Sequence, residues 1–248
     1  MGFSFFRQLQ KRDRDFSINV DGEMMPVKVI ENDRAKRLTL RLLPNGKGLK
    51  VTTPSHVSDD EIESFVGRNR NWAASKLSRM PDATTLEIGN TILYQGIEHK
   101  IISSGTTRGV IEPRVLGNEY VLSVPGEPSA VPRKLLSYLK KQARIELNRV
   151  VADHAATINV RPKKIRITDT TSRWGSCSTT RTLSFSWRII MAPPEVLDYL
   201  AAHEVAHLVE MNHSPNFWAV TKKLCPNTDI HKTWLKRHGS KLHAVVVT

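Results

Sequence analysis

Eleven residues, 203–213, constrain this chain more than any other segment. They read His-Glu-Val-Ala-His-Leu-Val-Glu-Met-Asn-His. On a helix, His203 and His207 are four residues apart, so their side chains project from one face, one turn from each other. Two neutral imidazoles placed in this way hold one Zn²⁺ and leave coordination positions free. Glu204 lies next to the first histidine and can act as general base on a water at the metal.

The flanking residues predict how a third ligand, His213, reaches the same metal. Pro193-Pro194 suits a helix start, and apolar residues then recur at helical spacing. Position 210 holds glutamate where the metzincin pattern has glycine, so we expect the helix to run about one turn further and to reverse at Met211-Asn212. Ser214-Pro215 then opens a second helix over 216–224. Three histidines and a water are the ligands of a catalytic zinc, because structural zinc sites usually close with four protein ligands.

Five blocks in the second half of the chain resemble one family. They lie at 173–178, 183–188, 192–194, 203–207 and 212–218, and in this order they are similar to the YgjP-like metal-dependent hydrolases, relatives of the SprT-like zinc metallopeptidases. The resemblance implies an α+β fold with a zincin-like metallopeptidase core, in which helices pack on a small antiparallel or mixed sheet behind a β-rich N-terminal part.

The same resemblance implies a set of site residues. It makes His203, His207 and His213 the ligands of one zinc ion and Glu204 the base. It leaves the substrate open, because members are labelled peptidases by motif while a nucleotide pyrophosphatase activity has been attributed to some.

Four further residues are candidate contacts to the substrate or the transition state. Arg173 and Arg188 can hold developing negative charge, and His231 can polarise a substrate oxygen. Ser176 lies in the first of the five blocks. A strand over 183–190 alternates apolar and polar residues, and we expect a peptide to add to it if it borders the cleft.

The rest of the chain predicts two parts divided at 125, where prolines and a glycine interrupt the pattern at 124–128. Residues 1–125 form a β-rich part with one helix, and residues 126–248 form the catalytic domain. The elements expected on this reading are antiparallel strands within 17–53 with turns at Asp21-Gly22 and Asn45-Gly46, a helix over 58–79, strands over 86–124, and helices over 131–157 and 228–243.

The net charge and the cysteines limit which partners and which cellular compartment we expect. Lysine and arginine number 37 against 24 acidic residues, a net charge of +13 that favours anionic partners. The basic clusters are not interleaved with aromatic residues, so nucleic acid is not the favoured partner. The two cysteines lack metal-binding spacing, and no apolar run reaches membrane-spanning length. These features predict a cytoplasmic protein without a membrane span.

Three functions compete on this sequence. The first is a zinc metallopeptidase that acts on a peptide or protein. The second is a nucleotide pyrophosphatase on the same metal site, with Mg²⁺ or Mn²⁺ in place of zinc. The third, of another class, is a basic nucleic-acid-binding protein with structural zinc. That protein would have no use for Glu204 and would need a fourth ligand that the sequence does not offer.

Overall fold

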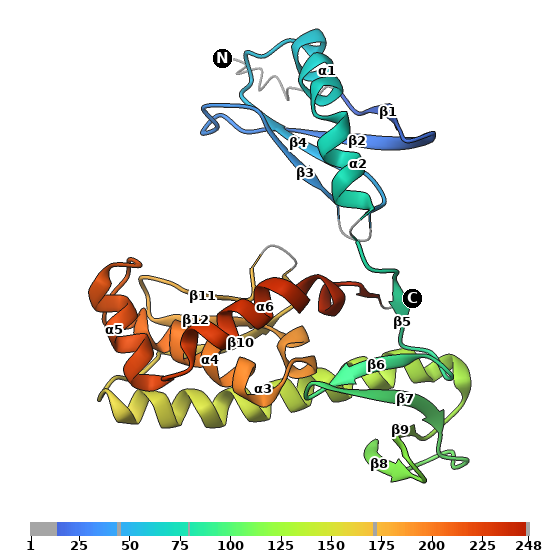
Figure 1. The fold of residues 1–248 in the computed structure, drawn as a ribbon, viewed down its shortest axis with the longest axis vertical. Coiled ribbons are helices and arrows are strands. Elements are labelled where there is room, and N and C mark those ends of the chain that lie inside the picture. Colours follow the sequence, from blue (N-terminus) through green and yellow to red (C-terminus); the bar gives the residue numbers. More distant parts are fainter. Residues whose placement is uncertain (1–13, 44–45, 79, 171–172, 247–248) are drawn as a thin grey trace, which may run out of the picture. The chain divides into compact units, whose positions relative to one another are not determined.

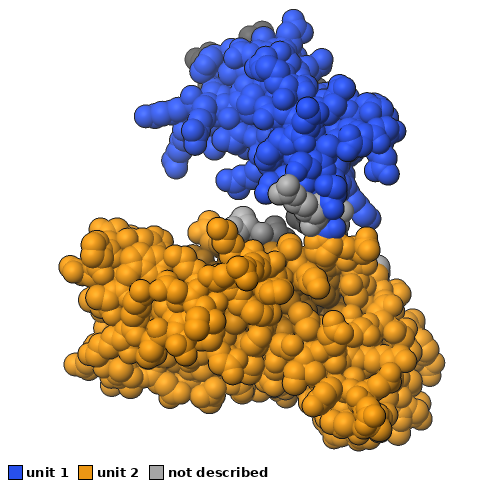
Figure 2. All heavy atoms as spheres, in the orientation of Figure 1, with its two compact units in different colours: residues 1–80 blue, residues 81–248 orange. Residues whose placement is uncertain are grey.

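The computed structural model of the chain describes residues 14–43, 46–78, 80–170 and 173–246. The chain forms two compact units, Met1–Met80 and Pro81–Thr248 (Figure 2). The predicted division at 125 is therefore corrected to 80. Strands between 86 and 124 belong to the second unit because they share one apolar core with the long helix that follows them. Buried members of this core from both sides of position 125 are Leu86, Ile92, Ile101, Leu122, Leu135 and Leu139.

The first unit is a four-stranded sheet followed by two short helices. Asp21 and Gly22 form the predicted hairpin turn, with φ of 51° and 91°. The expectation of antiparallel strands is wrong for one pair, because β2 and β4 run parallel in the order β1-β2-β4-β3. Asn45, from the second predicted turn, lies outside the described residues. The strands are β1 (Phe16–Val20), β2 (Glu23–Glu31), β3 (Thr39–Leu42) and β4 (Leu49–Thr53).

The helix predicted over 58–79 is two helices, α1 (Asp59–Arg68) and α2 (Arg70–Leu77). Ser58 caps α1, since its hydroxyl accepts a hydrogen bond from the backbone N–H of Glu61 at 3.3 Å. Asn69 separates the helices, with its backbone outside the helical region and its side-chain amide bound to the carbonyl of Phe65. An asparagine that bonds its own preceding turn competes with the helix in this way.

The second unit begins with a sheet connected like the first one. Its order β6-β7-β9-β8 again joins two hairpins through a parallel central pair. The long helix α3 follows over Val131–Thr157, as predicted. The other elements of this part are β5 (Thr84–Thr85), β6 (Thr91–Tyr94), β7 (Ile97–Ser103), β8 (Glu112–Leu116), β9 (Glu119–Val124) and the 3₁₀ helix η2 (Pro128–Ala130).

The hairpin turn between β6 and β7 docks on the segment that leads into the predicted metal-binding helix. The backbone N–H groups of Gln95 and Gly96 donate to the carbonyls of Ile190 and Met191 at 3.0 Å each. Gly96 has φ 81°, and a Cβ there would lie 2.8 Å from Cγ of Pro193. Only glycine allows this close approach, which fixes the start of the helix.

The remaining elements form the α+β core expected from the resemblance (Figure 1). This core consists of a three-stranded mixed sheet, in the order β10-β12-β11, and of the helices α3, α4, α5 and α6. Among the helices, α4 packs against α3, α5 and α6. No helix among the described residues has the length and apolar character of a membrane span. The bounds are β10 (Lys164–Thr168), β11 (Gly175–Cys177), β12 (Thr182–Ser186), the 3₁₀ helix η3 (Trp187–Met191), α4 (Pro194–Ala206), α5 (Pro215–Leu224), α6 (Thr228–His243) and β13 (Val245–Val246).

Candidate metal centre

The predicted metal-binding motif lies at the C-terminal end of α4, and the helix stops earlier than predicted. Its last residue is Ala206, not one beyond position 210. His207 keeps a helical backbone, with φ −65° and ψ −14°, so it stays on the face of His203. The helix then ends in tight turns, in which the N–H of Leu208 reaches the carbonyl of Val205 at 2.9 Å.

The three histidines converge on one point. Their ligand atoms all lie within 4.8 Å of one another, and Nε2 of His203 is 3.2 Å from Nε2 of His213. His213 reaches this point because the chain reverses before α5. Ser214 caps that helix and accepts a hydrogen bond from the backbone N–H of Phe217 at 3.3 Å.

The hydrogen bonds and burial of the histidines suit metal ligands. Nδ1 of His207 is 2.9 Å from the carbonyl oxygen of Glu210. A carbonyl only accepts, so Nδ1 carries the proton and Nε2 offers a lone pair. Burial lowers the pKa of His207, and it lowers the pKa of His203 to about 3 with a further contribution from the neighbouring histidines. Both imidazoles are therefore neutral at pH 7, as metal binding requires.

Phe217 packs against all three histidine rings. It is fully buried in α5, and its ring is stacked on His207 with centroids 4.4 Å apart. His203 and His213 meet the same ring edge-on, at 4.9 and 4.8 Å. Trp218 covers the outer side of His213 at 5.8 Å and carries the ammonium of Lys232 over its own ring, 4.1 Å from the centroid. Aromatic packing thus orients the three candidate ligands, together with the bond from His207 to the Glu210 carbonyl, and no carboxylate among the described residues hydrogen-bonds to their rings.

We expect the substitution Phe217→Leu to weaken zinc binding roughly tenfold or more, the range seen when supporting groups around metal ligands are removed. Leucine stays apolar but no longer fills the space against the three imidazoles, so their rotamers loosen. Zinc affinity is measured by competition with a chromophoric chelator. The control is Phe185→Leu, at an equally buried phenylalanine of β12. It should lower stability without changing zinc affinity, and equal losses of affinity in both variants would contradict the positioning role.

Glu204 is buried beside the histidines with one free oxygen. It is 3% exposed, and Oε2 has no hydrogen-bond partner among the described residues. Burial raises the pKa of Glu204 to about 8, although the positive charge of Arg173 opposes this shift. A carboxyl group with such a pKa accepts and releases a proton near neutral pH.

Gly175 in β11 makes room for this carboxyl group. A Cβ at position 175 would lie 2.3 Å from Oε1 of Glu204 and 2.8 Å from its Cδ. Gly175 and Cys177 alternate with Ser176 along the strand, and the pKa of the Cys177 thiol is raised by burial and by Glu204. Gly175 and Cys177 therefore face Glu204, while the side chain of the candidate contact Ser176 points to the other face of the strand.

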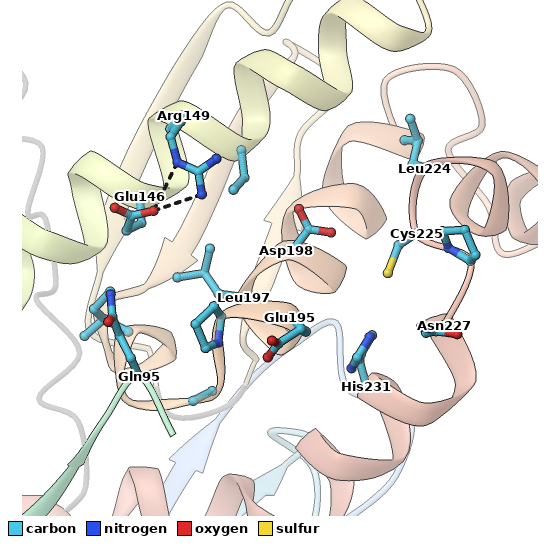
Figure 3. Close-up of a pocket in the computed structure, with 15 residues that line it drawn as sticks. Gln95, Glu146, Arg149, Glu195, Leu197, Asp198, Leu224, Cys225, Asn227 and His231 are labelled. Carbon is cyan, nitrogen blue, oxygen red and sulfur yellow. Dashed lines mark hydrogen bonds and ion pairs between the residues drawn. The ribbon is translucent and has the colours of Figure 1, made fainter. Parts of the chain in front are cut away.

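Two other candidate contacts do not reach the site. Arg188 is 6% exposed and its guanidinium bonds Asp169 at 3.0 Å and the carbonyls of Leu242 and Val245. It is corrected to a structural role, because η3 begins directly after β12 and turns residue 188 inward. His231 lines a separate cavity that none of the three histidines lines (Figure 3). Arg173 is exposed, and its charge acts on Glu204.

The sequence assigned no site role to Gly175 or Phe217, although both fall in segments that carry the resemblance. A glycine inside a short strand signals close approach of another group, and this was the available signal for Gly175. Phe217 has the spacing of a core residue on an amphipathic helix. Nothing in that pattern separates packing on ligands from packing on other apolar side chains.

The segment that carries Arg173 is held by a stacked ring pair. Trp174 lies on His243 of α6, with centroids 4.2 Å apart and planes at 27°. Gly239, one turn earlier, leaves room for the indole, since a Cβ there would lie 3.0 Å from it. Burial lowers the pKa of His243 to about 4, and the charge of Arg188 contributes.

We expect this histidine to make folding sensitive to acid. Its pKa in the folded state lies below the unfolded value, so its stabilising effect is present above about pH 6.5 and is lost as pH falls towards 4. Because the ring is partly exposed, the loss at pH 5 should be about 1 kcal/mol. Urea unfolding of the parent and of His243→Phe at pH 7 and pH 5 measures it. If the free energy of unfolding falls equally in both proteins between pH 7 and pH 5, His243 is not responsible for the acid sensitivity.

The comparisons with known proteins bear on the same residues. A family model described as "YgjP-like, metallopeptidase domain" matches residues 36–238, most of the chain and all of the site above. The chain belongs to the YgjP-like family. The resemblance drawn from five sequence blocks is thereby confirmed, and a YgjP-like chain is a metal-dependent hydrolase of the metallopeptidase type.

Two solved structures are similar to parts of the chain. One is the metallopeptidase zymogen abylysin of Pyrococcus abyssi, with 21% identity, a TM-score of 0.35, and coverage of 41% of this chain and 99% of that one. The other is the zymogen jannalysin of Methanocaldococcus jannaschii, with 19% identity, a TM-score of 0.33, and coverage of 37% and 94%. Among curated proteins, none matches the chain.

Proposed function

We propose that this YgjP-like protein is a zinc-dependent peptidase in which Glu204 transfers protons. One observation carries the proposal: three convergent histidines stand beside a buried carboxyl group that has an oxygen without a hydrogen-bond partner among the described residues. Three nitrogen ligands that leave a position open are typical of catalytic zinc. The elevated pKa of Glu204 suits an acid–base group.

In this mechanism each residue has a separate task. His203, His207 and His213 would hold the metal, and the bound ion would supply Lewis-acid chemistry, which polarises a carbonyl and lowers the pKa of water. Glu204 accepts a proton at Oε2 from the attacking water and delivers it to the departing amine nitrogen. Gly175 keeps the carboxyl group in place, and burial of Glu204 excludes other water from it.

We propose that the substrate peptide lies along β11. The strand predicted over 183–190 cannot receive it, because both edges of β12 are already paired, with β10 and with β11. The far edge of β11 is unpaired within the described residues. In β11 the main-chain groups of the even-numbered residues face β12, as the bonds of Trp174 and Ser178 to it show. An extended peptide on the far edge would therefore bond the main chain of Gly175 and Cys177 and pass close to Glu204, which packs against Gly175.

The direct test is hydrolysis by zinc-loaded protein of a quenched fluorescent peptide library and of a nucleoside triphosphate panel with Mg²⁺ or Mn²⁺. Cleavage of peptides that stops on chelation and returns with zinc is the expected result. Turnover of nucleotides without any peptide cleavage would overturn the proposal and favour the pyrophosphatase. Salt-dependent DNA binding without turnover of either would favour the structural-zinc alternative.

We propose that Arg173 stabilises negative charge in the transition state. The substitution Arg173→Gln should lower kcat roughly tenfold to a hundredfold with a smaller change in KM, since the interaction forms with the developing charge. Arg166→Gln, at an exposed arginine of β10, is the matched control and should keep the parent kcat. A rise in KM alone would assign Arg173 to substrate binding instead.

A further inference from the structure

A cavity of about 360 Å³ lies apart from the metal centre in the second unit (Figure 3). It is bounded by α3, the start of α4, the connection from α5 to α6, and the turn between β6 and β7. Neither Glu204 nor any of the three histidines lines it. Its volume is in the range of small-ligand sites.

One wall of the cavity is formed by buried apolar side chains. Val150 comes from α3, Leu197 from α4 and Leu224 from α5, and each is at most 9% exposed. Ile190 and Ala192, both 1% exposed, complete this wall on the side of η3. Such a surface suits the aliphatic part of a ligand, because burying it releases water from apolar groups on both sides.

Most of the charged groups around this wall are carboxylates, and Gln95, Asn227 and His231 are further polar groups that line the cavity. Glu146, Glu195 and Asp198 line the cavity with one cation, Arg149. Arg149 is already paired, with Glu146 at 3.1 Å and Asp153 at 3.4 Å. The cavity is therefore negative, within a chain whose net charge is +13.

Two of the carboxylates can still accept hydrogen bonds from a ligand. Glu195 makes no ion pair with any residue that the structure describes. One oxygen of Asp198 accepts from Nε2 of His154 at 2.9 Å, and a carboxylate has further acceptor sites. A place in the first turn of α4 accounts for an acidic residue at 195. It does not account for an open apolar cavity beneath that residue.

The spacing of these groups selects the kind of cation. Among the described residues, the three histidines of the metal centre are the only set of three or more His, Cys, Asp or Glu side chains that converge closely enough for a metal ion. The acidic groups of the cavity lie further apart, so they suit a larger ion. An ammonium or guanidinium group with several donors can bridge them.

We propose that this cavity is a second ligand site, which binds an organic cation with an aliphatic body. Glu195 and Asp198 hold its ammonium or guanidinium group, and Leu197 and Leu224 receive the aliphatic part. This chemistry has two sources, the side chain of arginine or lysine within a peptide and a free alkylamine or alkylguanidine. The site stands whether or not the metal centre cleaves peptides.

The test uses calorimetric titration of the full chain with agmatine, with the peptide acetyl-Gly-Arg-Gly-amide, and with butyrate as the anionic control. Agmatine or the peptide should bind, and Glu195→Gln should weaken that binding roughly tenfold, the range for a charged hydrogen bond. Glu119→Gln, at an exposed carboxylate of β9, is the matched control and should bind as the parent does.

The outcomes separate the sources and can refute the site. Binding of the peptide alone assigns the site to a protein segment, and binding of agmatine assigns it to free cations as well. Weaker binding at higher salt is expected for a charged contact at the cavity mouth. The proposal is overturned if neither cation binds the parent, if butyrate binds as tightly, or if folded Glu195→Gln binds like the parent.

Discussion

Replacing Glu204 by glutamine is expected to lower the rate of peptide hydrolysis by about 100-fold to 10,000-fold, the contribution typical of a positioned acid–base group. Glutamine has the shape of glutamate but cannot accept a proton at Oε2. The three histidines are untouched, so the zinc content and zinc affinity of Glu204→Gln should equal those of the parent. Hydrolysis of the most active library peptide and metal analysis of the same sample are the two measurements.

The pattern of these two results decides between roles for Glu204. Loss of hydrolysis with zinc retained supports proton transfer, whereas loss of both would make Glu204 a metal-supporting residue. Parent activity in Glu204→Gln would refute the mechanism. The control is Glu127→Gln, at an exposed carboxylate before α3, which should keep the parent rate.

Gly175→Ala is expected to reduce hydrolysis nearly as much as Glu204→Gln. The new Cβ would lie 2.3 Å from Oε1 of Glu204, far inside van der Waals contact. Either the carboxyl group moves from its buried position or β11 moves away from α4. Overpacking of this kind costs about 1–3 kcal/mol of stability, so the variant should remain folded. Hydrolysis, zinc affinity and urea unfolding are measured together.

The double variant makes this prediction sharper. If Gly175 acts through Glu204, adding Gly175→Ala to Glu204→Gln should cost little further activity, because the two changes remove one function. If the activity loss of the double variant equals the product of the two single losses, Gly175 acts independently of Glu204. Gly67→Ala in α1 is the matched control, since a Cβ there meets no atom within 4 Å. It should leave hydrolysis unchanged.

The helix end after the metal-binding motif shows a limit of local patterns. Apolar spacing continues through Leu208, and glutamate in place of the metzincin glycine at position 210 predicted a helix running about one turn further. The observed end at Ala206 follows from tight turns and from the bond between the His207 ring and the carbonyl of Glu210. Hydrogen bonds of side chains to nearby backbone compete with a helix, and hydrophobic periodicity contains no information about them.

The division of the chain shows a second limit. Prolines and a glycine at 124–128 predicted a boundary, and the chain does change from strand to helix there. Leu122 and Leu135, on either side, nevertheless lie in one core. A break in secondary structure becomes a boundary between units only where few apolar contacts cross it, and such contacts depend on the tertiary fold.

By itself the sequence predicted the candidate ligands and the acid–base candidate, and it determined the family. Spacing of four on a helix places His203 and His207 on one face, whatever the surroundings. Only the tertiary structure decided which other residues serve the site. It brought Gly175 against Glu204 and Phe217 against the three histidines, turned Ser176 away and buried Arg188. The reason is that helical spacing is a local property of the chain, whereas close packing between β11, α4 and α5 arises only when distant segments meet.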